Sequence, residues 1–168
     1  MNRTVAIAIS AFRSNEAVIE LLEAIFDKPH PEVETIIVVD SLGDGEISAT
    51  AAAREWTILL ENFDKNLGSA GNLARRMEIA GEIGAEWCLC LNHDANWDPN
   101  RLDVMLKIAR SRPRVGAVYP VLDHSPREPR WQEGSQEFTP SAHKRFIDIP
   151  TDESTTDVLW GASNFALY

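Results

Sequence analysis

Three short apolar runs within the first 91 residues each stop at a polar side chain, and this pattern constrains the fold more than any other feature. The runs cover residues 5–9, 36–39 and 87–91. They stop at Ser10, at Asp40 and at Asn92, which is followed by His93 and Asp94. Continuous apolar runs of this length are typical of strands buried on both faces in a parallel sheet. Because ligands bind outside the carboxyl ends of such strands, we expect these polar side chains to gather along one edge.

Helical spacing of apolar residues between these runs predicts an alternation of strand and helix. The expected strands are 4–11, 35–40, 56–61, 87–92 and 115–119, and the expected helices are 15–26, 47–54, 66–84 and 99–112. Such alternation predicts an α/β domain with a mostly parallel central sheet flanked by helices. After Pro120 the chain becomes rich in Pro, Arg, Glu, Ser and Gln. There we expect an irregular, more antiparallel part, with a loop or hairpin around 130–138 and short strands at 144–149 and 156–160.

Length and charge narrow the classes of partner. The chain has 168 residues and a formal net charge of −10, which fits one soluble domain and argues against nucleic acid, since binding nucleic acid needs clustered Lys and Arg. A phosphorylated small molecule stays open, because a divalent cation can bridge acidic side chains to phosphate. No apolar run approaches the ~20 residues of a membrane span.

The two cysteines, Cys88 and Cys90, occupy alternate positions of one expected strand. Their side chains should share a face of the sheet, and we interpret them as reduced core residues. A zinc site would need further Cys or His ligands at suitable spacing. Reduced thiols and a chain that starts directly with a strand, without a signal peptide, predict a cytoplasmic protein.

Asp40 is the first candidate site residue. A carboxylate at the end of a strand can accept hydrogen bonds from a base or a ribose, as in dinucleotide-binding folds. The alternative is a turn or helix cap within the segment 40–45, which reads Asp-Ser-Leu-Gly-Asp-Gly.

The segment 66–71, Asn-Leu-Gly-Ser-Ala-Gly, joins an expected strand to an expected helix. Glycines there let the backbone approach a ligand, and the N-terminus of the helix offers free N–H groups to anions. Its spacing is neither that of a Walker loop nor that of the dinucleotide fingerprint. Taken alone, the segment is better explained as a tight turn between strand and helix.

Asp94 is the candidate metal ligand. Mg²⁺ and Mn²⁺ prefer oxygen ligands and accept one or two protein carboxylates together with substrate phosphate. His93 could also ligate, although a lone His more often makes surface hydrogen bonds. Asp98 precedes Pro99 and is expected to cap the following helix rather than to bind metal.

The tryptophans divide into two groups. Trp56 and Trp87 stand at the starts of expected strands and are interpreted as packing residues. Trp97, Trp131 and Trp160 fall in loops or near the later strands, where they are candidates either for contacting the apolar face of a sugar or for the core.

The strand ends and loop segments described above, taken in their order along the chain, resemble those of the family 2 glycosyltransferases with a GT-A (nucleotide-diphospho-sugar transferase) fold. The resemblance covers about residues 4–168 and rests on the ends of the first two strands, on segment 66–71 and on segment 91–95. Residues 66–77 are similar to the corresponding region of galactofuranosyltransferase-like and rhamnosyltransferase-like members. The resemblance to the family implies a single GT-A domain, with residues 1–119 as its nucleotide-sugar-binding half and 120–168 as the start of its acceptor side.

The resemblance also implies roles for individual residues. The nucleotide-sugar site would comprise Ser10, Ala11, Phe12, Arg13, Asp40, Asn66, Gly68, Gly71, Arg75, Asn92 and His93. Residues 92–94 stand where the family carries its DxD motif, so Asp94 would hold Mg²⁺ or Mn²⁺ on the donor diphosphate, with Asn92 in place of the first acidic residue. Trp160 and Gly161 resemble the segment that forms the floor of the acceptor site.

The implied reaction transfers a sugar from a nucleotide-diphospho-sugar to a glycan or lipid-linked acceptor, with inversion. In inverting members the base is an acidic residue of a Glu-Asp pair after the segment that resembles 160–162, so we expect the catalytic base beyond Tyr168. Peripheral association with the cytoplasmic face of a membrane stays open.

Two other functions are weighed. One is a nucleotide-sugar-binding module without catalysis. The other is a sugar nucleotidyltransferase, which usually carries a Gly-rich basic loop straight after the first strand. Segment 11–15 is too short and lacks those glycines.

Overall fold

The computed structural model describes residues 4–112, 114–119, 136–138, 144–146 and 165–168. The strands are β1 Val5–Ala11, β2 Val33–Ser41, β3 Leu59–Phe63, β4 Trp87–Asn92, β5 Gln136–Phe138, β6 Lys144–Phe146 and β7 Phe165–Leu167. The helices are α1 Asn15–Asp27, α2 Glu46–Ala53, α3 Gly68–Glu82 and α4 Pro99–Ser111.

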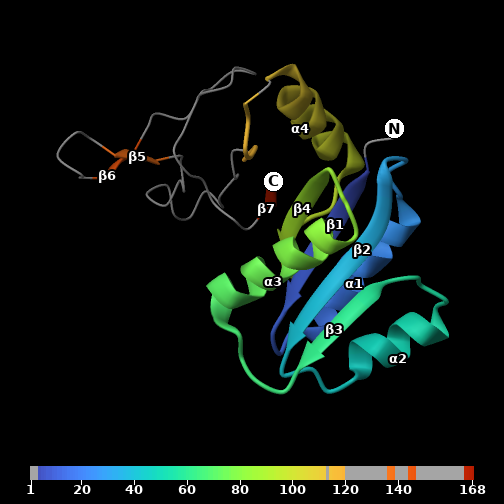
Figure 1. Cartoon of the computed structure of the whole chain (residues 1–168). Helices are drawn as coiled ribbons and strands as arrows, with labels where there is room; N and C mark the ends of the chain where they lie inside the picture. Colours follow the sequence, from blue (N-terminus) through green and yellow to red (C-terminus); the bar gives the residue numbers. More distant parts are fainter. Residues whose placement is uncertain (1–3, 113, 120–135, 139–143, 147–164) are drawn as a thin grey trace, which may run out of the picture.

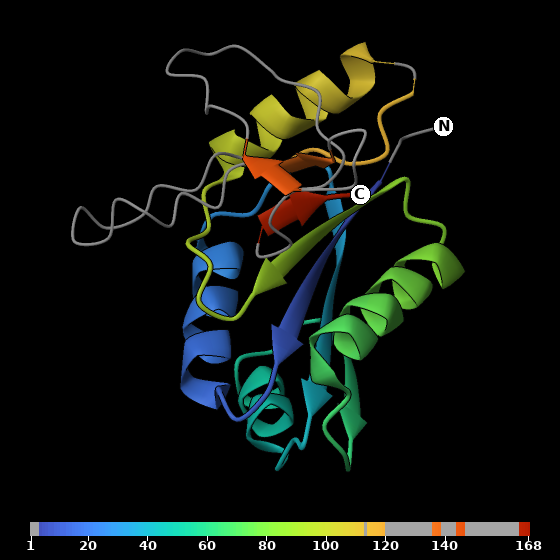
Figure 2. The same cartoon turned by 90° about the vertical axis from the view of Figure 1, so that its left-hand side faces the viewer.

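A five-stranded sheet forms the centre of the protein, in the order β3-β2-β1-β4-β7 (Figure 1). The first four of these strands are parallel, and β7 pairs antiparallel with β4. In Figure 2 the arrowheads of β1 to β4 all point toward the bottom of the view, so their carboxyl ends share one edge. The predicted mostly parallel α/β sheet flanked by helices is confirmed. The antiparallel pair β5 and β6 lies in the predicted C-terminal part.

The helices cover both faces of the sheet, with α3 on one side and α1, α2 and α4 on the other (Figures 1 and 2). Side chains of β1 alternate between these faces. Ile7 and Ile9 point toward α1 and α4, whereas Ala6 and Ala8 point toward α3. Since alanine is short, α3 can lie close to the backbone of the sheet.

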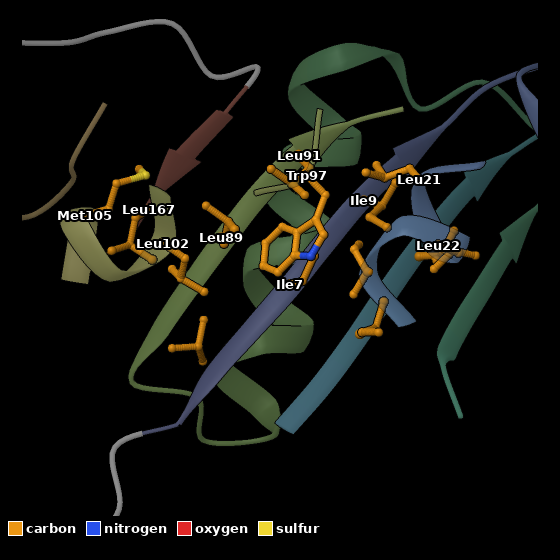
Figure 3. Packing of buried hydrophobic residues seen from close by; sticks show 14 of the residues in the cluster. Ile7, Ile9, Leu21, Leu22, Leu89, Leu91, Trp97, Leu102, Met105 and Leu167 are labelled. Carbon is orange, nitrogen blue, oxygen red and sulfur yellow. The ribbon is translucent and has the colours of Figure 1, made fainter. Parts of the chain in front are cut away.

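The larger core cluster lies beneath α1 and α4 (Figure 3). It includes Trp97, which is only 6% exposed and whose indole Nε1–H donates to the Lys28 carbonyl at 2.9 Å. The segment between β4 and α4 packs back onto this face of the sheet and buries the ring. Trp97 is therefore a core residue, and the alternative prediction that its ring contacts a sugar is wrong. Trp131 and Trp160 lie outside the described residues.

Several strand boundaries differ from the prediction by one to three residues, and the largest differences concern the third and fifth expected strands. The third strand begins at Leu59 rather than at Trp56. The Trp56 ring stacks on Phe26 of α1 with centroids 5.1 Å apart, and the Trp56 backbone N–H donates to the Ala51 carbonyl of α2 at 2.9 Å, so Trp56 belongs to the turn after α2. The expected strand at 115–119 is reduced to a single antiparallel bridge between Val118 and Leu167. The expected strand at 156–160 lies outside the described residues.

Cys88 and Cys90 are buried free thiols, as predicted, with their Sγ atoms 3.7 Å apart. They pack under α3, where the Cys90 thiol lies 3.8 Å from the Met77 sulfur. Among the described residues, no helix combines the length and the apolar character needed to cross a membrane.

Asp98 caps α4, as predicted: its carboxylate accepts from the Asn100 backbone N–H at 3.0 Å, and Pro99 occupies the first turn. We expect Asp98→Ala to lower the free energy of unfolding by about 1 kcal/mol, since the helix loses one capped N–H. Urea denaturation followed by circular dichroism measures this. An unchanged free energy of unfolding would contradict the cap.

Candidate functional site

The parallel register brings the predicted polar residues to one edge of the sheet. Ser10 of β1 stands opposite Asn92 of β4, and Ala11 stands opposite Asp40 of β2. The Ser10 hydroxyl donates to the Asn92 amide oxygen over 3.4 Å. The ends of β1, β2 and β4 therefore share one edge of the sheet, with Ser10 and Asn92 together on the α3 face and Asp40 on the opposite face.

Asp40 is a buried carboxyl group, only 2% exposed. No donor among the described residues reaches its Oδ1 atom. Burial raises the pKa of Asp40, and the nearby Asp44 carboxylate raises it further. The Ser41 hydroxyl and the Asn72 amide oxygen, both also buried, lack partners in the described part of the chain too. Because buried polar groups are nearly always paired, the unpaired Asp40 oxygen is a candidate acceptor for a hydrogen bond from a ligand.

Gly43 lets the turn after β2 close over Asp40. A Cβ atom added at Gly43 would lie 2.5 Å from Asp40 Oδ2 and 2.7 Å from Asn62 Oδ1. No side chain fits there, so the glycine is needed for this close approach. Gly43 and Asn62 were not singled out from the sequence. For Gly43 a signal was present, because the Gly-Asp-Gly sequence of residues 43–45 is typical of a turn.

The loops after β1 and β2 each contain a residue in the left-handed region. Arg13 has φ of 53° and Leu42 has φ of 66°. Such a conformation costs roughly 1–3 kcal/mol for a residue with a side chain and is concentrated at functional sites. Phe12 is 42% exposed, and the Arg13 guanidinium carbon lies 5.4 Å from its ring centroid. The loop after β1 therefore exposes an aromatic ring and a cation next to Ala11, which is buried.

A polar contact fixes these two loops relative to one another. The Asn15 amide donates to Asp44 Oδ1 at 2.9 Å and to Glu46 Oε2 at 2.7 Å. Asp44 also accepts from the Glu46 backbone N–H at 3.1 Å. This backbone hydrogen bond, and then Asn15, lower the pKa of Asp44. Neighbouring acids thus have pKa values shifted in opposite directions, Asp40 upward and Asp44 downward.

The segment 66–71 forms the turn into α3. The Asn66 carboxamide oxygen accepts from the Gly68 backbone N–H at 2.8 Å, and Gly68 has φ of 67°. At Gly71 an added Cβ would meet only Leu67, at 3.4 Å. The geometry accounts for Asn66 and Gly68 as turn residues; their contact with a ligand stays a prediction.

Arg75 does not lie with Asp40 and Asn92. Its guanidinium is held by Glu61 of β3, at 2.6 Å and 3.2 Å, and by Glu78 and Glu82 of α3 at 3.1 Å and 3.2 Å. Its hydrogen bonds to Glu61, and then to the other two glutamates, raise the pKa of Arg75. Its predicted part in nucleotide-sugar binding would require these ion pairs to open.

Segment 92–94 carries the candidate metal ligand. Asp94 is exposed, and the Ala95 backbone N–H donates to the Asn92 carbonyl at 3.1 Å, which turns the chain at the end of β4. The described ranges contain no cluster of three or more His, Cys, Asp or Glu side chains able to hold a metal ion. One exposed carboxylate fits a cation that arrives with a diphosphate, which supplies the other oxygens.

Asn72 and Arg76 were not identified from the sequence as candidate residues. Both are on α3, and they are 5% and 3% exposed. The signal was present, because polar residues at 72 and 76 share the helical face of the buried Ile79 and Ala80. Burial lowers the pKa of Arg76. The predicted acceptor-side residues Trp160 and Gly161 lie outside the described residues.

Comparison with known proteins gives one family match. The model of the family described as glycosyl transferase family 2 matches residues 6–165. No curated protein sequence matches this chain at a significant level.

Several solved structures share the fold. A mannosyltransferase from Pyrobaculum calidifontis in complex with GDP-Man and Mn²⁺ is 24% identical over 76% of this chain, with a TM-score of 0.59. S. aureus TarS in complex with UDP-GlcNAc is 18% identical over 64% of it, with a TM-score of 0.51. The chain spans 37% and 31% of their lengths. A 4-diphosphocytidyl-2C-methyl-D-erythritol synthase is 14% identical over 99% of the chain and 75% of its own length, with a TM-score of 0.57. At these identities the likeness concerns the fold.

Proposed function

Because this chain belongs to glycosyl transferase family 2, we propose that it binds a nucleotide-diphospho-sugar at the carboxyl edge of its sheet for transfer of the sugar to a glycan or lipid-linked acceptor. The observation that carries the proposal is the buried Asp40 carboxyl, whose Oδ1 atom has no donor among the described residues. A ribose hydroxyl or a base N–H would supply the missing hydrogen bond.

Phe12 and Arg13 complete the nucleoside side of the proposed site. An exposed aromatic ring can stack on a base, and the adjacent guanidinium can attract phosphate. Ser10 and Asn92, already hydrogen-bonded to one another, would line the floor between base and diphosphate.

Asp94 would hold a divalent cation together with the donor diphosphate, with His93 beside it. Support comes from its exposed position after β4 and from the Mn²⁺ in the mannosyltransferase complex. When bound, Mg²⁺ or Mn²⁺ would neutralise the charge that develops on the departing diphosphate. Segment 66–71 would approach the same phosphates with the N–H groups at the start of α3.

Inverting transfer also requires a base that takes the proton of the acceptor hydroxyl while the sugar–phosphate bond breaks. We place the acceptor on the side of Trp160 and Gly161, as the family pattern implies. The division into a nucleotide-sugar half at 1–119 and an acceptor side from 120 is part of this proposal. Galactofuranosyl or rhamnosyl specificity rests on residues 66–77 and is proposed with it.

The test is calorimetric titration of UDP, GDP and dTDP with and without Mn²⁺. We expect at least one of these nucleotides to bind, and to bind more tightly with Mn²⁺ than without it. Asp94→Ala should lower the affinity about tenfold, equivalent to ~1.4 kcal/mol, but only when Mn²⁺ is present. Asp98→Ala is the matched control. Its carboxylate lies four positions further along but caps α4, so the effect of Mn²⁺ should persist.

Several results would count against this function. Equal affinity with and without Mn²⁺, or an unchanged effect of Mn²⁺ in Asp94→Ala, would refute the metal bridge. Absence of binding by all three nucleotides would refute the site. Release of pyrophosphate from a nucleoside triphosphate and a sugar phosphate would instead identify a nucleotidyltransferase.

A further inference from the structure

Two buried polar side chains attach α3 to the sheet. Asn72 and Arg76 lie one helical turn apart, so both face the sheet. The Asn72 amide donates to the Val39 carbonyl of β2 at 2.9 Å. Arg76 Nη1 donates to the carbonyls of Ala8 in β1, at 2.9 Å, and of Leu91 in β4, at 3.1 Å. One helix is thereby bonded to three neighbouring strands.

The carbonyls that they contact lie next to the candidate site. Val39 immediately precedes Asp40, and Leu91 immediately precedes Asn92. The helix that carries Asn72 and Arg76 begins at the 66–71 turn. Asn72 thus connects this turn to the nucleoside side of the site, and Arg76 connects it to the metal side.

Stability alone does not explain a charged residue at position 76. Arg76 is 3% exposed, its hydrogen bonds in the structure go to carbonyls, and its Nε–H has no partner among the described residues. Burying a charge is costly, and replacing such a group by an apolar residue of similar volume is often neutral or stabilising. An apolar side chain could fill this position on α3, but it could not bond two strands at once.

We propose that Asn72 and Arg76 are positioning residues that hold the 66–71 turn, the end of β2 and the end of β4 in one fixed arrangement, so that the nucleoside and the diphosphate of one ligand are bound together. This inference rests on the proposed function. It assigns the two residues no contact with the ligand's reacting atoms. They act through Asp40 and through segment 92–94.

The test separates the two halves of the ligand. For Arg76→Met we expect the affinity for guanosine or uridine to stay within about twofold, while the gain in affinity from nucleoside to nucleoside diphosphate with Mn²⁺ falls about tenfold. For Asn72→Leu we expect the reverse: a nucleoside affinity about tenfold weaker and a preserved gain from diphosphate and Mn²⁺. Calorimetry is run at a temperature where circular dichroism shows every variant folded.

Conservative and distant variants guard against a merely structural explanation. Arg76→Lys keeps a cation that can donate to both carbonyls and should restore most of the lost gain. Arg110→Met removes a guanidinium that pairs with Glu32 at the side of α4, and it should alter neither affinity. Equal losses of nucleoside and diphosphate affinity in Arg76→Met, or no rescue by Lys, would overturn the proposal.

Hydrogen exchange distinguishes failure of this inference from failure of the proposed function. In Arg76→Met the amides of 92–95 should exchange at least about tenfold faster, and in Asn72→Leu those of 40–43 should do so. If the wild-type protein binds no nucleotide, the proposed function fails, whatever the exchange rates. If it binds nucleotide and these amides exchange at unchanged rates in both variants, the positioning role is refuted.

Discussion

Replacing Asp40 with asparagine is expected to weaken nucleoside diphosphate binding by up to about 100-fold and, at neutral pH, to stabilise the free protein. The loss of affinity follows because the carboxylate offers charge-assisted hydrogen bonds, which contribute about 1.5–3 kcal/mol each, and the amide replaces one acceptor by a donor. Calorimetry at fixed Mn²⁺ measures the affinity, and the loss should appear without metal as well.

The gain in stability follows from the buried position of Asp40. Burial raises the pKa of this carboxyl in the folded protein above its unfolded value. Its contribution to stability is therefore fully present below the unfolded pKa of ~3.9 and is lost as the pH rises through the folded pKa. Asparagine stays neutral throughout. The difference in melting temperature between Asp40→Asn and wild type should thus be small near pH 4 and should grow toward pH 7.

Asp44→Asn is the matched control, because its pH dependence has the opposite sign. The Glu46 backbone N–H, and then Asn15, lower the pKa of Asp44 in the folded protein. Its contribution is present above the unfolded pKa and is lost as the pH falls through the folded pKa. Asp44→Asn should therefore melt below the wild type at pH 7, with a difference that shrinks on acidification. Parallel pH profiles of the two variants would contradict the assigned environments.

The sheet was predictable because continuous apolar runs leave little choice. Ile7, Ile37 and Leu89 lie within runs too apolar for any position but a strand covered on both faces, and all three are completely buried. The third strand was placed too early, since Trp56 and Ile58 suit a strand equally well. The stacking of Trp56 on Phe26 is a contact across 30 positions of sequence that local propensity does not contain.

The candidate site was predictable where it depends on strand ends. Ser10, Asp40 and Asn92 follow apolar runs, and parallel register is enough to bring them to one edge of the sheet. Arg76 and Gly43 were missed for a different reason. Their importance comes from atoms of other elements, the Ala8 and Leu91 carbonyls in one case and the Asp40 carboxylate in the other. Residue type and spacing do not record which backbone atoms a side chain will reach.

Trp97 is the residue for which the structure decided between two alternatives left open by the sequence. As a core residue it should make a large contribution to stability, and we expect Trp97→Ala to lower the free energy of unfolding by about 3–5 kcal/mol. The deletion empties the space between β1, β4 and α4 and leaves the Lys28 carbonyl without its indole donor (Figure 3). Urea denaturation followed by circular dichroism gives the value.

Trp97→Phe separates the two parts of this loss. Phenylalanine keeps most of the apolar packing but removes the N–H donor, so its cost should be smaller than that of alanine and should include about 1 kcal/mol for the lost hydrogen bond. Below the melting transition, both variants should bind nucleoside diphosphate as the wild type does. If Trp97→Ala left the stability unchanged and weakened sugar-nucleotide binding, the result would show that the ring contacts the sugar and is not part of the core. Only the loss of a side chain that contacts the ligand can weaken binding without weakening core packing.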